Sequence, residues 1–137
     1  MTDRNLAHLH ADLQPLCRQF IDQCKAQQIE ARVTCTYRSA AEQDRLFASG
    51  RDASGKVVGK IVTKARGGQS QHNTTLNDGT PASRAFDFVV MNDDGSCNWN
   101  PNTPQWKAAV AIGKALGLAW GGDFPAKFFD ACHFQLP

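Results

Sequence analysis

The run RAFDFVV at residues 84–90 constrains the fold most, because large apolar side chains alternate there with smaller or polar ones. A period of two is the pattern of a β-strand whose two faces differ. Phe86 and Phe88 belong to one face and Asp87 to the other. A carboxylate on a mostly apolar strand is costly to desolvate unless a cation or strong donors compensate its charge. The alternatives are a pair with Arg84 or Arg38, or a solvated sheet face.

The other predicted elements follow from hydrophobic periodicity and from residues that begin and end helices. Ser39 and Glu42 form a capping box, in which each side chain satisfies a free backbone N–H of the other. Thr103 and Pro104 suit the start of a further helix. The predicted helices span residues 12–28, 40–47 and 104–116, and the predicted strands span 31–37, 84–90, 118–120 and 133–136. This order predicts an α+β fold, with a small antiparallel sheet packed against helices.

The length and composition fit a single globular domain, residues 1–137. The formal net charge of +2 is too small to indicate a nucleic-acid partner. No apolar stretch follows Met1 as in a signal peptide, and no segment has the length of a membrane span, so we expect no membrane insertion. The five cysteines are an odd set without a Cys-x-x-Cys pair, which disfavours a disulfide framework and favours a reducing cytoplasm.

Residues 50–83 are rich in Gly, Ser, Thr, Asn and Asp, and they predict a long loop with room for a hairpin. Long ordered loops commonly carry function. This loop contains His72, and His133 opens the last predicted strand. Taken singly, each of these two histidines fits a structural role better than a ligand role. His8 and His10 are expected on the surface.

Asp87 changes this assessment, because it and His133 point into one groove if their strands are neighbours. Two imidazoles and one carboxylate suit Zn²⁺, which in catalytic sites keeps three protein ligands and an open fourth position. Asp130, three residues before His133, is the candidate general base that accepts a proton from the attacking water. A turn-forming aspartate is the alternative. Cys132 is disfavoured as a fourth ligand, because strand alternation turns it away from His133.

Three motifs resemble those of a known group of zinc peptidases: SQH at 70–72, AFD at 85–87 and DACH at 130–133. The group includes VanY-type D-alanyl-D-alanine carboxypeptidases, VanX-type dipeptidases and phage L-alanyl-D-glutamate endopeptidases. The segment TYRSAAEQDRLF at 36–47 resembles the group's Tyr-Arg segment. The resemblance therefore spans the chain from Thr36 onward.

The resemblance implies a role for each matching residue. His72, Asp87 and His133 would bind zinc, and Asp130 would act as acid and base. Arg38 would stabilise the oxyanion that forms as the carbonyl becomes tetrahedral. The remaining expected site residues, which would hold Arg38 or the substrate, are Gln43 and Ser70.

The resemblance to the phage endopeptidases is nearest, because Asp130 stands in place of a glutamate and the last histidine is followed by Phe-Gln. We therefore expect a monomeric zinc metallopeptidase, an endolysin, that hydrolyses the L-alanyl-D-glutamate bond in the peptide stem of peptidoglycan. It would be made in the host cytoplasm and reach the wall through a separate membrane-permeabilising protein. Residues 73–83 look like a loop insertion. The alternatives are a D-alanyl-D-alanine carboxypeptidase and, from another class, a non-catalytic wall-binding zinc domain.

Overall fold

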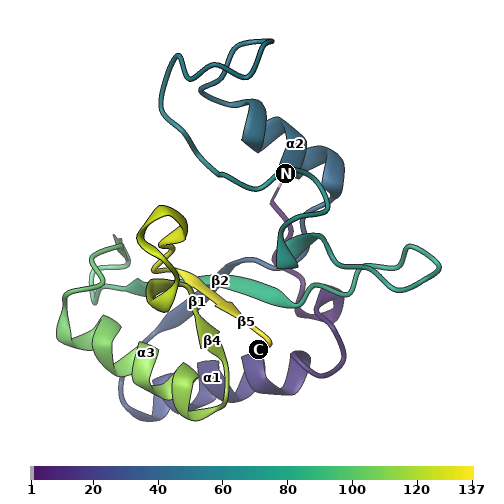
Figure 1. Cartoon of the computed structure of the whole chain (residues 1–137). Coiled ribbons are helices and arrows are strands. Elements are labelled where there is room, and N and C mark those ends of the chain that lie inside the picture. The colour runs from purple at the N-terminus through teal and green to yellow at the C-terminus, as the bar shows by residue number, and fades with distance from the viewer. Residues whose placement is uncertain (1) are drawn as a thin grey trace.

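The predicted strands form one antiparallel sheet in a computed structural model that describes residues 2–137 (Figure 1). Its strands are β1 (Ala31–Cys35), β2 (Ala85–Met91), β3 (Cys97–Asn98), β4 (Ala119–Trp120) and β5 (His133–Gln135). The order is β1-β2-β5-β4, and β3 pairs with the end of β2. The predicted α+β class is confirmed. The sequence did not predict β3, because two residues are too few to show alternation.

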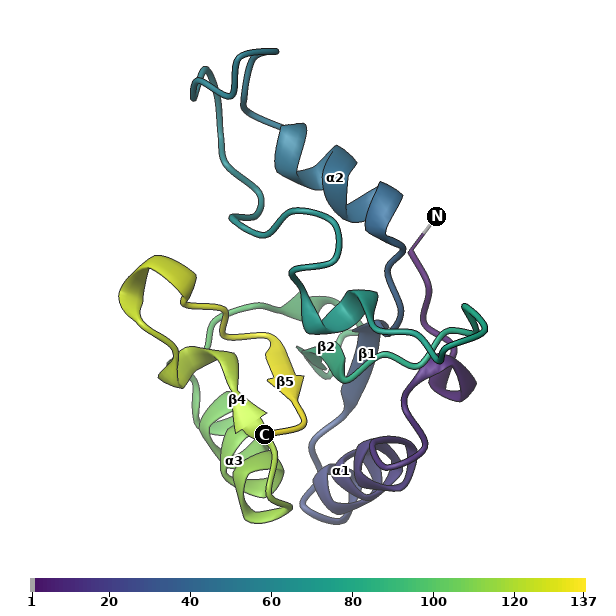
Figure 2. The ribbon, with the colours of Figure 1, turned by 45° about the vertical axis from the view of Figure 1, so that its right-hand side comes forward.

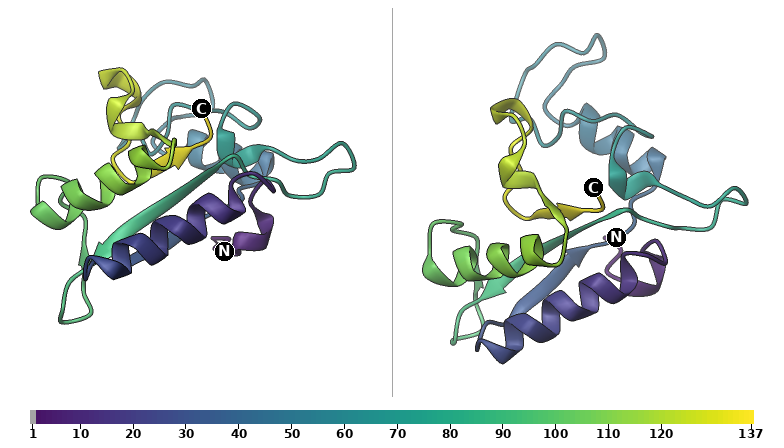
Figure 3. Two further views of the ribbon diagram at one scale, coloured as in Figure 1. Left: turned by 90° about the horizontal axis from the view of Figure 1, so that it is seen from below. Right: turned by 60° about the horizontal axis from the view of Figure 1, so that its bottom comes forward.

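Of the three α-helices within residues 2–137, two cover one face of this sheet. The helices are α1 (Gln14–Ala26), α2 (Ala40–Ala48) and α3 (Pro104–Ala115). Figure 3 shows α1 and α3 side by side against the sheet, whereas α2 and the loop that follows it stand on the other side (Figure 2). Helix α1 is shorter than predicted, because residues 11–13 form a turn and Pro15 takes its place in the first helical turn. The face that α1 and α3 leave open is therefore the one available for a site.

Aromatic rings fix the two strands that matter most for that site. Four phenylalanine rings pack together here: Phe20 of α1, Phe86 and Phe88 of β2, and Phe134 of β5. The centroids of rings in contact lie 5.1 to 5.8 Å apart. All four are fully buried, and such contacts add to the free energy gained from burying their area. Because side chains alternate along a strand, Asp87 and His133 are presented on the opposite face.

A bulge in β1 changes the face of one residue. Val33 pairs with Phe88 and Cys35 pairs with Asp87, so the register shifts by one residue between them. Val33 packs against the core, whereas Cys35 faces the same side as Asp87. Simple alternation along the predicted strand 31–37 puts Val33, Cys35 and Tyr37 on one face, and this expectation is wrong because a bulge puts two residues opposite one and reverses the alternation.

The predicted long loop is confirmed over most of residues 50–83, where the only helical turn is the 3₁₀ turn Gln71–Asn73. Isolated bridges join Arg51 to Val57 and Thr75 to Pro81, so each part of the loop turns back on itself. The second bridge closes the residues expected as an insertion. Within residues 2–137, no helix combines the length and apolar character needed to cross a membrane.

Candidate metal centre

Asp87 and the two histidines predicted as ligands meet on the open face of the sheet. Asp87 and His133 are cross-strand partners on β2 and β5, and His72 reaches them from the turn Gln71–Asn73. One carboxylate oxygen, Asp87 Oδ1, lies 3.2 Å from His72 Nε2 and 3.3 Å from His133 Nδ1. All three side chains are largely buried. The structure thus brings together, from three separate segments, the residues predicted to bind zinc.

The other nitrogen of each imidazole is engaged away from Asp87. His72 Nδ1 lies 2.7 Å from the Thr36 carbonyl oxygen, and His133 Nε2 lies 2.8 Å from Gln135 Oε1. Each oxygen accepts a hydrogen bond, which places the lone pair of a neutral imidazole on the opposite nitrogen. The nitrogens available to a metal are therefore Nε2 of His72 and Nδ1 of His133.

The distance from each imidazole nitrogen to the carboxylate oxygen matches the distance between two ligand atoms of a tetrahedral metal ion. Zinc bonds of about 2.0–2.2 Å to nitrogen and oxygen put two ligand atoms about 3.3 Å apart at a tetrahedral angle. The two measured distances from imidazole nitrogen to Asp87 Oδ1 are 3.2 and 3.3 Å. Three protein ligands leave one coordination position open, as in catalytic zinc sites. The donor set therefore fits a catalytic rather than a closed structural metal site.

The charges of His72 and Asp87 stabilise each other when no metal is bound. Burial by itself lowers the pKa of His72, but the charge and hydrogen bond of Asp87 reverse this and raise the pKa to about 10. Burial raises the pKa of Asp87, but the positive charge of His72 and the close contacts with both imidazoles bring it well below its usual range. At neutral pH the metal-free site therefore holds a proton on His72 that a metal must displace.

The turn that carries His72 is held by its neighbours. Ser70 Oγ accepts a hydrogen bond from the His72 N–H at 3.2 Å, and Asn73 Oδ1 accepts one from the Ser70 N–H at 3.2 Å. Asn73 Nδ2 also donates to the Arg38 carbonyl at 2.8 Å. Ser70 thus caps the His72 turn, which the sequence did not predict, and its contact with substrate stays a prediction.

Arg38 points at the same cluster from the segment after β1. Its Nη2 lies 3.9 Å from Asp87 Oδ2, and its Nη1 donates to Gln43 Oε1 at 3.0 Å. Gln43 is 1% exposed, and its amide nitrogen donates to the Ala65 carbonyl at 2.9 Å. Gln43 therefore holds Arg38, which is one of the two roles expected for it, and also ties the long loop to α2.

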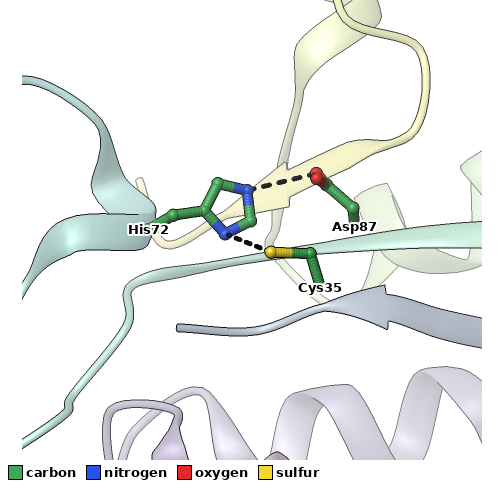
Figure 4. Close-up of side chains that lie close together, drawn as sticks. All are labelled: Cys35, His72 and Asp87. Carbon is green, nitrogen blue, oxygen red and sulfur yellow. Dashed lines mark hydrogen bonds and ion pairs between the residues drawn. The ribbon is translucent and has the colours of Figure 1, made fainter. Parts of the chain in front are cut away.

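Cys35 is a neighbour of the site that the sequence did not predict. The bulge in β1 places its thiol 3.9 Å from His72 Nδ1 and 3.6 Å from Arg38 Nη2. Cys35, His72 and Asp87 are close enough together to share a metal ion. Figure 4, however, shows the thiol and Asp87 at opposite nitrogens of the His72 ring. A metal on Nε2 of His72 would lie on the Asp87 side, so Cys35 packs beside the ligands rather than among them.

Asp130 lies next to the cluster and remains accessible. Its Oδ2 is 4.0 Å from His133 Nδ1, and half of its side chain is exposed. Partial burial and the charge of Asp87 raise the pKa of Asp130 above its usual range. A raised pKa moves the carboxyl group toward the pH at which it exchanges protons readily. The position and pKa of Asp130 therefore suit a general base.

Cys132 turns toward the site, contrary to the prediction. Its thiol donates to Asp130 Oδ1 at 3.2 Å and also lies near Asp87. The prediction was wrong because Cys132 lies in a turn before β5 begins, where strand alternation does not apply. Burial and the charges of Asp87 and Asp130 raise the pKa of this thiol, so it stays protonated and donates to Asp130.

The loop that carries Asp130, residues 121–132, is fastened at its base. Trp120 Nε1 donates to the Ala131 carbonyl at 2.8 Å, and the Asp130 N–H donates to the Gly121 carbonyl at 3.1 Å. A Cβ atom on Gly121 would lie 2.1 Å from the Asp130 carbonyl oxygen and 2.9 Å from His133 Cβ. Only glycine fits at position 121, and this close approach fixes Asp130 relative to His133.

The cluster opens into a cavity of about 720 Å³. The segment after α2 contributes Ile61, Val62 and Lys64 to its lining, and the 121–132 loop contributes Lys127 and Phe128. Cavities of this size accommodate small ligands and short peptide segments. Away from the two aspartates of the cluster, the lysines bring positive charge to the lining, so this part of the cavity suits an extended substrate that carries carboxylates.

Comparison with known proteins gives matches over the whole fold. A family described as D-alanyl-D-alanine carboxypeptidase matches residues 6–88, and a second family of the same description matches residues 63–136. The peptidoglycan L-alanyl-D-glutamate endopeptidase CwlK of Bacillus subtilis (strain 168) is 37% identical in an alignment 137 residues long that covers 92% of this chain and 74% of the relative.

Two solved structures share the fold. The L-Ala D-Glu endopeptidase ChiX of Serratia marcescens superposes with a TM-score of 0.63 at 24% identity, covering 100% of this chain and 89% of that one. The LD-carboxypeptidase LdcB gives a TM-score of 0.64 at 15% identity, covering 93% and 58%. Together with the sequence matches and the metal-ligand geometry, these findings show that the chain belongs to the D-alanyl-D-alanine carboxypeptidase family of peptidoglycan metallopeptidases.

Proposed function

We propose that the chain is a zinc-dependent endopeptidase that hydrolyses the L-alanyl-D-glutamate bond in the peptide stem of peptidoglycan. The observation that carries the proposal is the meeting of His72, Asp87 and His133 on one face of the sheet, where each imidazole nitrogen lies 3.2–3.3 Å from Asp87 Oδ1 and Asp130 stands beside them in an open cavity. The choice of bond is supported by the 37% identity to an endopeptidase of that specificity.

Each residue of the site has a separate role in amide hydrolysis. A zinc ion held by His72, Asp87 and His133 would supply a Lewis acid that polarises the scissile carbonyl and lowers the pKa of a nearby water. Asp130 takes the proton from the attacking water and returns it to the leaving amine. Arg38, held by Gln43, donates to the oxygen that becomes negatively charged. The cavity lysines bind carboxylates of the stem peptide.

The function is tested by digesting purified peptidoglycan with the zinc-loaded protein and analysing the released fragments by mass spectrometry. The proposal expects fragments that begin with D-glutamate, and it expects a chelator to stop their release and added zinc to restore it. Release of D-alanine would instead favour the D-alanyl-D-alanine carboxypeptidase named by the family description. Sedimentation with cell walls without cleavage under any divalent metal would favour a wall-binding domain.

Replacing Arg38 by methionine is expected to lower kcat by about 10²–10³-fold, because one donor to the developing oxyanion is lost. The loss of rate is measured with a soluble stem peptide as the substrate. R38K should recover only part of the rate, because an ammonium group lacks the planar set of N–H donors of a guanidinium. The matched control is R32M, since Arg32 is exposed on β1 and pairs with Glu30 at 2.6 Å. An R38M rate equal to that of R32M would remove Arg38 from the mechanism.

The proposal also covers where the protein is made, how it reaches the wall and its oligomeric state. We infer synthesis in a host cytoplasm, action on the wall after a separate protein permeabilises the membrane, and a monomeric enzyme. The support is the likeness to the phage endopeptidases. Expression in bacteria with and without a membrane-permeabilising protein tests the first two points, because lysis should require both proteins. Sedimentation velocity tests the third.

A further inference from the structure

We propose that Gln135 is a positioning residue that makes His133 bind the metal through Nδ1. The inference rests on the metal site proposed above. Gln135 Oε1 lies 2.8 Å from His133 Nε2, within hydrogen-bond distance. Both residues belong to β5 and stand two positions apart, so strand geometry points their side chains to the same side.

The surroundings of the His133 ring explain why this contact is needed. Nδ1 lies 3.3 Å from Asp87 Oδ1 and 4.0 Å from Asp130 Oδ2. Two carboxylates favour a proton on Nδ1, and that proton would occupy the lone pair that a metal requires. The amide oxygen of Gln135 accepts a hydrogen bond only from Nε2–H, so it favours the tautomer whose lone pair is on Nδ1. Such outer contacts commonly set the orientation and basicity of a ligating histidine.

The position of Gln135 in the sheet supports this role. It pairs with Ala85 of β2 on one side and Ala119 of β4 on the other, so its backbone is fixed between two strands. The corresponding contact of His72 is with the main-chain carbonyl of Thr36, which a side-chain substitution does not remove. His133 is thus the ligand whose tautomer depends on a side chain.

The test is the zinc affinity of Q135L, measured by competition with a chromophoric chelator. The variant should bind zinc about 10–100-fold more weakly than the wild type, the usual cost of losing such a contact. Q135E keeps an acceptor and should bind within a few-fold of wild type. The control is Q71L, because Gln71 lines the same cavity and its side chain makes no hydrogen bond within residues 2–137. Q71L should bind zinc like the wild type.

A second readout separates positioning from a loss of folding. In the zinc-loaded wild type, the Nε2–H proton of His133 should be slow to exchange and visible by NMR, and in Q135L it should exchange with water and disappear. Thermal unfolding of the metal-free proteins shows whether each variant folds, and Q135M replaces Q135L if leucine does not. Wild-type affinity in a folded Q135L or Q135M overturns the inference. A wild type that binds no zinc overturns the proposed metal site itself.

Discussion

Replacing Asp130 by asparagine is expected to lower kcat for stem-peptide hydrolysis by about 10²–10⁴-fold, the usual contribution of a general base. The amide keeps the size of the side chain and removes its capacity to take a proton. Zinc affinity should stay within a few-fold of wild type, because Asp130 Oδ2 lies 4.0 Å from the metal-facing nitrogen of His133. Steady-state kinetics and zinc titration on the same preparation measure both effects.

The matched control for D130N is D123N. Asp123 lies in the same loop, is exposed, and pairs with Lys114 at 2.8 Å, away from the ligands. Its replacement should leave kcat unchanged. A D130N enzyme as fast as D123N would show that another group is the base, and a D130N protein without zinc would show that Asp130 is a ligand.

Replacing Asp87 by asparagine should have the larger effect, with a loss of activity beyond the about 10²–10⁴-fold expected of D130N. Asp87 Oδ1 is the atom that both imidazole nitrogens face, so the substitution removes the central ligand. Bound zinc, measured by elemental analysis after dialysis, should fall from one ion per chain to nearly none. D93N is the control, because Asp93 is exposed just beyond the end of β2.

The proton held by His72 makes zinc binding depend on pH. In the wild type, Asp87 raises the pKa of His72 to about 10, so zinc displaces a proton at neutral pH. The apparent zinc affinity of the wild type should therefore rise with pH up to that value, as calorimetric titrations at several pH values measure. Without the charge of Asp87 the pKa of His72 falls, so in metal-free D87N the NMR signals of His72 should titrate at lower pH than in the wild type and D93N. An unchanged titration in D87N would mean that Asp87 does not hold the proton on His72.

Strand alternation predicted the centre of the site because two of its three proposed ligands lie in regular structure. Asp87 and His133 alternate with buried phenylalanines, so the sequence alone showed which face they occupy, and pairing of β2 with β5 placed them opposite each other. His72 lies in a 3₁₀ turn of a long loop, where no periodicity exists. Its place beside them was inferred from its residue type, once His8 and His10 had been set on the surface, and from the resemblance of SQH to a family motif.

The residues that surround the ligands were harder to predict, for identifiable reasons. Cys35 reaches the site through a bulge, and an extra residue in a strand leaves no mark on a short alternating pattern. Cys132 was assigned to the wrong side because the strand pattern was extended one residue into a turn. Gln43 looks like an exposed helix residue until the long loop covers it. Contacts of this kind depend on where loops dock, which hydrophobic periodicity does not encode.

The 121–132 loop is held in place at its base rather than at its tip. Hydrogen bonds from Trp120 and Asp130, and the close approach at Gly121, hold the base, whereas Phe128 at the tip is half exposed beside the cavity. Phe124 still packs against the ring of His133, so the part of the loop that can vary is the tip, residues 125–129. Chimaeras that exchange only this tip should alter the wall of the cavity while Asp130 and His133 keep their places.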